Sequence, residues 1–226
     1  MNGILLIDKP ISYTSHDIVD GVRHKLGMRR VGHAGTLDPM ATGLLILLVG
    51  QATKQSNHMT DFDKCYDGVM TLGCDTETFD AEGRIIQCVE PPPLEDHMIQ
   101  KVFEQHEGWI DQQVPRYSAV KMQGKKCYER ARNEEGFEPP TRRVHVQKME
   151  FLQQVEEDIF FRAQVSKGTY IRSLAYDIGR ALGFGMMLSC LRRISVGHYS
   201  IREALSYSDF LKMPTFQIES RLRACS

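Results

Sequence analysis

The sequence lacks long hydrophobic runs, internal repeats and any excess of charge of one sign. Its longest apolar run, residues 44–49, is far shorter than the roughly 18–20 residues that a membrane-spanning helix requires. The N-terminal residues 1–8 carry no basic region and are typical of a strand rather than a signal peptide. We therefore expect a cytoplasmic protein without a membrane partner.

Paired-cysteine motifs are also absent. The six cysteines include no C-x-x-C pair and no spacing typical of a zinc site, and the eight histidines are scattered. A cytosolic setting argues against disulfides, so the expectation is structural thiols and no metal. The cysteines concerned are Cys65, Cys74, Cys88, Cys127, Cys190 and Cys225.

The near-neutral net charge of −1 conceals an uneven distribution. Basic residues are concentrated between Arg116 and Lys148, and two further doublets lie at 29–30 and 192–193. Such local patches can bind phosphates even when the whole protein is neutral, although a solvated face is the better interpretation of any one doublet. With 226 residues, the chain can bury the core of one large domain or two small ones.

The segment 32–43 is the most informative part of the chain. It places Asp38 in a glycine-punctuated loop directly before the apolar residues 44–49, which predict a buried strand. Glycines permit close approach of a ligand, and Pro39 restricts the backbone of Asp38. A carboxylate held in this way is a candidate nucleophile or general base, the alternative being an aspartate that caps a turn.

Hydrophobic patterning predicts a mixture of strands and helices without regular β-α-β alternation, which favours an α+β fold. A first helix, capped by Ser15 or Asp17, is expected to end at Gly27, and the strands 66–72 and 85–89 are expected to form a hairpin-like pair. Further strands are expected at 3–7, 144–155, 159–165 and 194–201, and further helices at 95–107, 126–133 and 171–182, the last stopped by Gly183. Residues 112–143 have no core of their own and are predicted to leave the body of the protein.

Three more segments stand out beside the Asp38 loop, at 64–73, 117–126 and 166–174, and the triplet 191–193 belongs with them. In this order and spacing the segments resemble the pseudouridine synthase family of the TruB type, from residues 3–10 to residues 196–199. The resemblance implies a mixed, largely antiparallel central sheet flanked by helices. It implies a catalytic domain over 1–202 with a basic RNA-binding insertion at 124–143. Residues 203–226 are then a short helix and tail, too short for the RNA-binding domain of the PUA type that bacterial relatives carry.

The resemblance also implies roles for single residues. Asp38 matches the family's catalytic aspartate, which acts at the ribose of the target uridine by attack on C1′ or by proton removal from C2′. Arg172 matches the arginine partner of that carboxylate, and Tyr66 matches a tyrosine that stacks on the target base. The alternatives are an arginine that flanks a helix start and a tyrosine in the core.

Other positions match family residues that line the substrate pocket or contact the RNA. Tyr170 and Leu191 match walls of the uracil pocket, and His33 matches a histidine close to the flipped nucleotide. Lys9 and Lys121 are candidates for phosphate or pocket contacts. The RNA backbone is expected to contact basic residues of the insertion, namely Lys125, Lys126, Arg130, Arg142 and Arg143.

The function implied is that of a monomeric enzyme that isomerises uridine to pseudouridine at position 55, in the T-loop of tRNA, with no cofactor and no metal. One alternative is a non-catalytic chaperone that folds tRNA, and another is a synthase acting on a different T-loop-like RNA. A hydrolase with an aspartate nucleophile is disfavoured because its usual sequence signatures are missing. Phe79, Val114 and the pair 186–187 depart from the family pattern.

Overall fold

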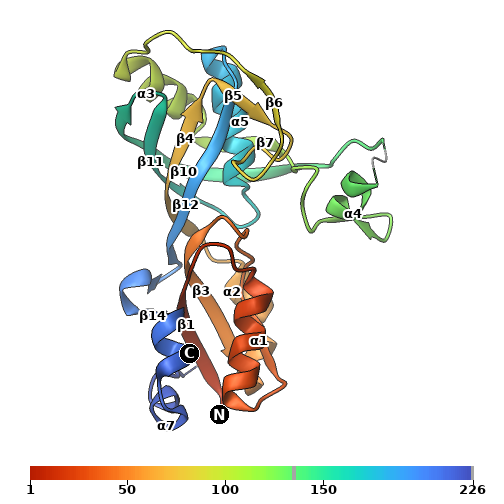
Figure 1. Cartoon of the computed structure of the whole chain (residues 1–226), viewed down its shortest axis with the longest axis vertical. Coiled ribbons are helices and arrows are strands. Elements are labelled where there is room, and N and C mark those ends of the chain that lie inside the picture. Colours follow the sequence, from red (N-terminus) through yellow and green to blue (C-terminus); the bar gives the residue numbers. More distant parts are fainter. Residues whose placement is uncertain (134–135, 225–226) are drawn as a thin grey trace. The chain divides into compact units, whose positions relative to one another are not determined.

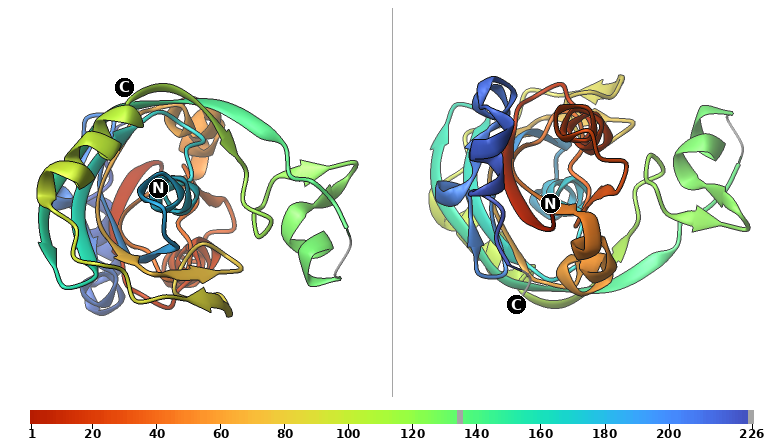
Figure 2. Two further views of the ribbon diagram at one scale, coloured as in Figure 1. Left: turned by 90° about the horizontal axis from the view of Figure 1, so that it is seen from above. Right: turned by 90° about the horizontal axis from the view of Figure 1, so that it is seen from below.

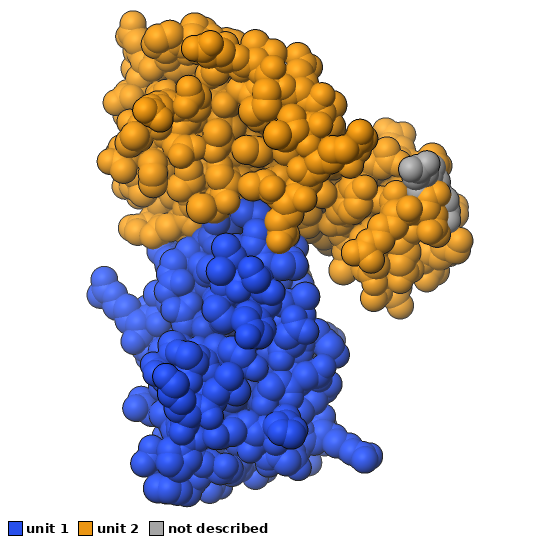
Figure 3. Space-filling view, in the orientation of Figure 1, with its two compact units in different colours: residues 1–66, 191–226 blue, residues 67–190 orange. Residues whose placement is uncertain are grey.

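A computed structural model describes residues 1–133 and 136–224 of the chain; Glu134 and Glu135 of the expected insertion, and Cys225 and Ser226 of the expected tail, lie outside the described residues. The chain forms two compact units (Figures 1 and 3). Unit 1 comprises residues 1–66 and 191–226, and unit 2 comprises residues 67–190. The chain passes between them in strands β4 (Lys64–Leu72) and β12 (Met186–Val196). The expected extent of the catalytic domain, 1–202, stays a prediction.

Unit 1 is built on a sheet whose strand order is β14–β1–β3–β12, with β2 paired to β3 and β13 paired to β12. Its remaining strands are β1 (Gly3–Lys9), β2 (Val31–His33), β3 (Thr42–Val49), β13 (Tyr199–Ser200) and β14 (Leu205–Ser206). Its helices, with η for a 3-10 helix, are α1 (Ser15–Leu26), η1 (Gly50–Gln55), α2 (Ser56–Thr60), η2 (Ile201–Glu203), α6 (Tyr207–Lys212) and α7 (Thr215–Glu219).

Strands β1 and β3 are antiparallel and buried on both faces. On one face, Leu45 and Leu47 pack with apolar residues of α1 and α6, among them Ile18 and Phe210. On the other face, Leu44 and its alternate neighbours pack with residues of α2, β12 and β13. Burial on both faces explains why β3 is a continuous apolar run rather than an alternating one.

Helix α1 begins one residue earlier than the predicted caps imply. The Thr14 side chain accepts a hydrogen bond from the Asp17 amide at 3.1 Å, and the Asp17 carboxylate accepts one from the Thr14 amide at 2.8 Å. These reciprocal bonds form a capping box, so Asp17 is the partner of the cap rather than the cap itself. The helix ends at Gly27 in the left-handed conformation, with φ 63°, as predicted.

Unit 2 contains the strand order β12–β4–β11–β10–β7, and α5 lies inside the curve of these strands (Figure 2). Its remaining strands are β5 (Cys74–Thr76), β6 (Ile85–Cys88), β7 (Gly108–Gln113), β8 (Lys121–Met122), β9 (Lys125–Lys126), β10 (Thr141–Val155) and β11 (Asp158–Val165). Its helices are α3 (Asp96–Gln105), α4 (Cys127–Arg132) and α5 (Ile171–Leu182). All three match predicted helices, and Gly183 ends α5 with φ 89°. The mixed sheet and its flanking helices confirm the α+β fold.

Two strand predictions are wrong. Strand β6 pairs with β5 rather than with β4, because β4 ends at Leu72, directly before Gly73. Gly73 has a left-handed backbone (φ 94°), and its amide donates to the Gly185 carbonyl at 2.7 Å. Strand β12 begins at Met186, eight residues before the predicted start, since Met186 and Leu188 alternate into the core.

A disulfide joins Cys74 to Cys88, which are directly opposed on β5 and β6. The expectation of structural thiols is therefore wrong for this pair. Cys127 and Cys190 are free thiols. Across the part of the chain that the structure describes, there is no helix with both the length and the apolar character of a membrane span.

Candidate active site

Asp38 is half-buried in the loop 34–41 of unit 1, here called the aspartate loop. The Ser15 hydroxyl accepts a hydrogen bond from the Leu37 amide at 2.8 Å and donates to the Leu37 carbonyl at 3.2 Å. The Ser12 amide donates to the Pro39 carbonyl at 2.9 Å. The backbone on both sides of Asp38 is therefore fixed by groups from the start of α1 and the segment before it.

Two buried cationic side chains also hold the aspartate loop. Arg193, 1% exposed, donates to the carbonyl oxygens of Gly35 at 3.2 Å and Thr36 at 3.4 Å, and to that of Leu44 at 2.8 Å. Lys9, 0% exposed, donates to three carbonyls, including that of Pro39 at 3.3 Å. Buried charges require such partners, so both side chains act in positioning the loop. The predicted contact of Lys9 with a phosphate or with the pocket stays a prediction.

Gly43 connects the aspartate loop to the sheet. It has φ 102° and lies opposite Arg193 in the parallel pairing of β3 with β12. A Cβ atom at this position would lie 2.4 Å from the Arg193 carbonyl oxygen, a distance that no side chain tolerates. Glycine is therefore required here on two grounds, close approach and left-handed backbone.

His33 ends β2, directly before the aspartate loop, and is half-buried. Burial lowers the pKa of His33 below its ordinary value of 6.5, and the positive charge of Arg193 lowers it further. The imidazole is therefore neutral at physiological pH, and it would meet RNA as a hydrogen-bonding group rather than as a cation.

Two more predicted site residues lie at the margin of unit 1. Tyr66, on β4, is 7% exposed. Leu191, on β12, is half-buried, and its carbonyl accepts a bond of 3.4 Å from the Thr42 hydroxyl. Both have the burial expected of pocket walls and equally that of core residues, so their roles stay predictions.

Arg172, the second residue of α5 in unit 2, is 6% exposed. Its guanidinium donates to the Asp80 carboxylate at 3.4 Å and to the Tyr117 carbonyl at 3.0 Å, and lies 5.9 Å from the centre of the Tyr170 ring. The predicted pairing of Arg172 with Asp38 joins residues of different units and stays a prediction.

Asp80 is a residue that sequence reasoning missed. It is 2% exposed, and besides Arg172 its carboxylate accepts bonds from the Thr78 hydroxyl at 2.5 Å and the Glu82 amide at 3.1 Å. Phe79, a departure from the family pattern, stacks on Tyr176 of α5 at 4.2 Å between ring centres. The turn that carries Asp80 is thus tied to the helix that carries Arg172.

Gln112 is a second missed residue. Its side chain, 1% exposed on β7, accepts from the Tyr170 amide at 2.8 Å and donates to the Tyr170 carbonyl at 3.0 Å. This pair of bonds fixes the backbone of Tyr170 at the start of α5. No signal in the sequence indicates this role, because Gln112 was expected at the start of the segment that leaves the body of the protein and instead lies on a strand of the sheet.

Three of the predicted RNA-backbone residues, Lys125, Lys126 and Arg130, lie directly before or within α4, in the segment that projects from the sheet of unit 2 (Figure 1), whereas Arg142 and Arg143 lie on β10 opposite β7. Two of these cationic groups lie over aromatic rings near α4: Lys126 over Tyr128 at 5.3 Å, and Arg130 over Phe137 at 5.8 Å. Lys121 and Lys125 are exposed on β8 and β9, and Arg142 and Arg143 are exposed on β10. A surface of this composition can bind a polyanion.

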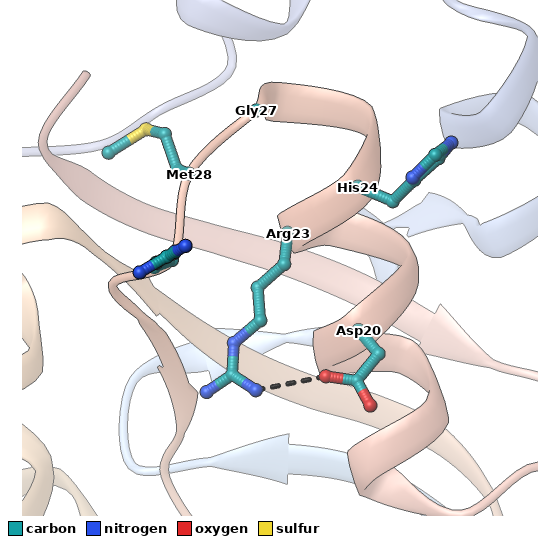
Figure 4. Close-up of a pocket in the computed structure, with 6 residues that line it drawn as sticks. Asp20, Arg23, His24, Gly27 and Met28 are labelled. Atoms are coloured by element: carbon teal, nitrogen blue, oxygen red, sulfur yellow. Dashed lines mark hydrogen bonds and ion pairs between the residues drawn. The ribbon is translucent and has the colours of Figure 1, made fainter.

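A hollow of about 410 Å³ in unit 1 lies at the end of α1, where Arg23 and Asp20 form an ion pair of 2.9 Å (Figure 4). None of the predicted site residues lines it. Within the described residues, no group of three or more histidine, cysteine or acidic side chains is arranged to hold a metal ion.

Comparison with known proteins gives a consistent result. Residues 23–171 match the family described as TruB family pseudouridylate synthase (N terminal domain). The chain is 40% identical over 222 residues to "tRNA pseudouridine synthase B" of Opitutus terrae, covering 98% of this chain and 92% of that one. It is 42% identical over 216 residues to the protein of that name from Geobacillus kaustophilus, covering 92% and 76%.

Among solved structures, the chain resembles one in "Crystal Structure of a Cbf5-Nop10-Gar1 Complex", with a TM-score of 0.75 and 29% identity. The match covers 98% of this chain and 57% of that one, so this chain spans little more than half of that structure.

Proposed function

The chain belongs to the TruB family of pseudouridylate synthases and is an enzyme that isomerises uridine to pseudouridine in tRNA; we propose that its target is the T-loop uridine at position 55, and that Asp38 acts at the ribose of that nucleotide. The observation that carries the proposal is the support of the aspartate loop, whose carbonyl and amide groups are held by buried Lys9, Ser15 and Arg193. A carboxylate on such a loop is preorganised.

The reaction is an isomerisation in which nothing is oxidised or reduced. The C1′–N1 glycosidic bond breaks, the uracil turns, and a C1′–C5 bond forms; the hydrogen of C5 leaves as a proton, and N1 gains one. Attack of Asp38 on C1′ and removal of the C2′ proton by Asp38 both assist the first cleavage, and both require a carboxylate at this position.

The flipped base requires a pocket that binds it, and the RNA backbone requires residues that bind its phosphates. We assign the walls to Tyr66, Tyr170 and Leu191, since an aromatic face tolerates rotation of a stacked base. Extrusion of the base from a folded loop costs a few kcal/mol. Phosphate contacts from the basic residues around α4 would offset that cost. Arg172, held by Asp80 and the Tyr117 carbonyl, is proposed to orient the reacting nucleotide.

A tRNA-folding chaperone without catalysis is the alternative function. It would use the same basic surface, but it would have no need of a half-buried carboxylate on a loop fixed by three buried polar side chains. Replacement of Asp38 by Asn separates the two functions, because only the enzyme needs the ionisable group.

The test is release of tritium from C5-labelled uracil in tRNA transcripts. The wild type is expected to release tritium from a transcript with uridine at position 55 and none attributable to that site when cytidine replaces it. Asp38→Asn should release none, and Asp20→Asn, which removes an exposed carboxylate elsewhere in unit 1, should match the wild type. Equal release from both transcripts would contradict the proposed target, and release by Asp38→Asn would contradict the assigned residue.

A further inference from the structure

Exposed Trp109 and Arg143 and half-buried His145 form a cluster on strands β7 and β10 of unit 2, here called the Trp109 platform. Trp109 is 64% exposed, and it is the only tryptophan in the chain. The Arg143 guanidinium lies over its ring at 5.6 Å, and the His145 ring is 4.9 Å away between centres. Arg143 is predicted to contact the RNA backbone, but no predicted role accounts for Trp109 or His145.

The strand register explains why these three side chains meet. His145 lies directly opposite Trp109, and Arg143 lies two residues along the same strand, opposite Asp111. Successive side chains of a strand point to opposite faces, so Trp109 and Gln112 project from opposite sides of β7. Gln112 is buried and holds Tyr170, whereas Trp109 is open to solvent. Strand β7 thus serves the proposed pocket on one face and presents the platform on the other.

We propose that the Trp109 platform binds an unpaired base of the RNA substrate, at a position other than the uridine that is modified. The inference rests on the proposed function for its ligand class. A base stacks on an indole ring regardless of its identity, and an arginine over the same ring adds attraction for the neighbouring phosphate. Aromatic and arginine side chains together are typical of sites that hold single-stranded RNA.

Side-chain type and position in the chain favour RNA over a protein as the occupant. On the platform's own face Arg143 is opposed by Asp111, so the preference rests on the indole and guanidinium groups and on the basic segment that precedes β10. Strand β10 also continues directly from the basic segment around α4, to which RNA binding is assigned. The platform therefore extends that surface along the same unit, and one substrate would contact both.

The single tryptophan makes the proposal directly measurable, since all indole fluorescence of the wild type comes from Trp109. Acrylamide should quench this fluorescence efficiently in the free protein, because the ring is exposed. Saturation with full-length tRNA transcript should protect the ring and lower the quenching constant several-fold. Unchanged quenching at saturating tRNA would overturn the proposal.

Substitutions test whether the stacked base contributes to affinity. Trp109→Ala should weaken tRNA binding by roughly tenfold, the scale of one stacked base, while Trp109→Phe should retain most of the affinity. Ile86→Ala is the matched control, because Ile86 is also 64% exposed in unit 2 and should not change affinity. Unchanged affinity of Trp109→Ala, in a protein that unfolds at the wild-type temperature, would overturn the proposal.

Two further results distinguish the platform from its alternatives. If the wild type self-associates and Trp109→Ala abolishes association without changing tRNA affinity, the cluster is a protein interface and the proposal is wrong. If tRNA protects Trp109 but no C5 tritium is released, the platform is supported while the proposed reaction fails. If C5 tritium is released but tRNA does not protect Trp109 from quenching, the proposed reaction is supported and the platform proposal is wrong.

Discussion

The aspartate loop and the basic segment around α4 differ in how their functional groups are held. In the loop, Lys9, Ser15 and Arg193 are all at most 2% exposed and bind backbone groups on both sides of Asp38. In the basic segment, several cationic groups lie over aromatic rings near the surface, as Arg132 does over Tyr128 at 5.5 Å.

This difference matches a division of roles, with catalysis in the aspartate loop and RNA binding in the basic segment. Chemistry at a ribose needs a carboxylate whose position is settled before substrate arrives, since a misplacement of an ångström costs catalysis. A phosphate backbone needs charge within reach rather than one fixed geometry. We therefore expect changes in the loop to alter the rate of the bound complex, and changes in the basic segment to alter affinity.

The largest expected effect follows from removing the reacting group. Asp38→Asn should lower turnover by at least about a thousandfold, as for other groups that act on the reacting atoms, while tRNA affinity stays near the wild-type value. Tritium release and filter binding on the same preparation measure the two quantities. A large loss of affinity would mean that the division of work is wrong.

Arg172→Leu and Asp80→Asn should each lower turnover by roughly 10- to 100-fold, because each leaves a buried charge without its opposite partner. The matched control is Asp67→Asn, which breaks the more exposed pair with Arg162 (2.7 Å) in the same unit. That pair contributes at most about 1 kcal/mol to stability, so the control should remain active. Full activity of Asp80→Asn would show that the buried pair does not position the site.

Reversal of Lys125, Lys126 and Arg130 to Glu should weaken tRNA binding by about tenfold or more at low salt. For every phosphate that these side chains neutralise in the wild type, the slope of log Kd against log salt should fall by roughly 0.7–0.9 in the variant. Binding isotherms at several salt concentrations provide the slope. Lys212→Glu in unit 1 serves as a control for the reversal of one exposed charge away from α4. An unchanged slope in the triple variant would show that these three side chains do not neutralise phosphates of the tRNA.

Ser15→Ala should have a smaller effect, because it removes one support of the aspartate loop and leaves the others. The buried Leu37 amide would lose its acceptor, at a cost of about 1–3 kcal/mol in the free energy of unfolding, with a few-fold loss of kcat and little change in KM. Urea denaturation measures the first quantity. Ser220→Ala, at an exposed hydroxyl, should leave both unchanged.

The smallest effect concerns pH. Burial holds the pKa of His33 below 6.5 in the folded state, so the unfolded chain binds more protons at mildly acidic pH. The resulting stability is present above pH 6.5 and is lost as pH falls through the folded-state pKa. Comparison of urea midpoints at pH 7.5 and 5.5 should show a smaller loss for His33→Gln than for the wild type; equal losses would assign the pH dependence to other groups.

Much of the fold was predictable, because local rules decide it. The apolar run of β3, the pattern of α5 and the glycines that end α1 and α5 each carry their own signal. The partner of β6 and the Cys74–Cys88 disulfide were not, since both depend on where Gly73 redirects the chain. The start of α1 was misplaced by one residue because Ser15, a favoured cap residue, directly follows the actual cap, Thr14.

The supports of the site were less predictable than its chemical groups. Asp38 and Arg172 stand in recognisable motifs. The partners that hold them are remote in sequence: Arg193 binds the Gly35 carbonyl across 158 residues, and Arg172 binds Asp80 across 92. Periodicity and turn chemistry contain no information on such pairs, nor on the three carbonyl groups that hold buried Lys9.

The most direct test of the division of work is the single-turnover rate of tritium release at saturating enzyme, measured for the Lys125, Lys126 and Arg130 charge-reversal variant beside the wild type. Saturation removes differences in affinity, so the rate reports only on the bound complex. The account predicts that the variant reaches the wild-type rate once enough enzyme is present. A rate that stays low at saturation would contradict it, because the basic segment would then take part in the chemistry that we assign to the aspartate loop.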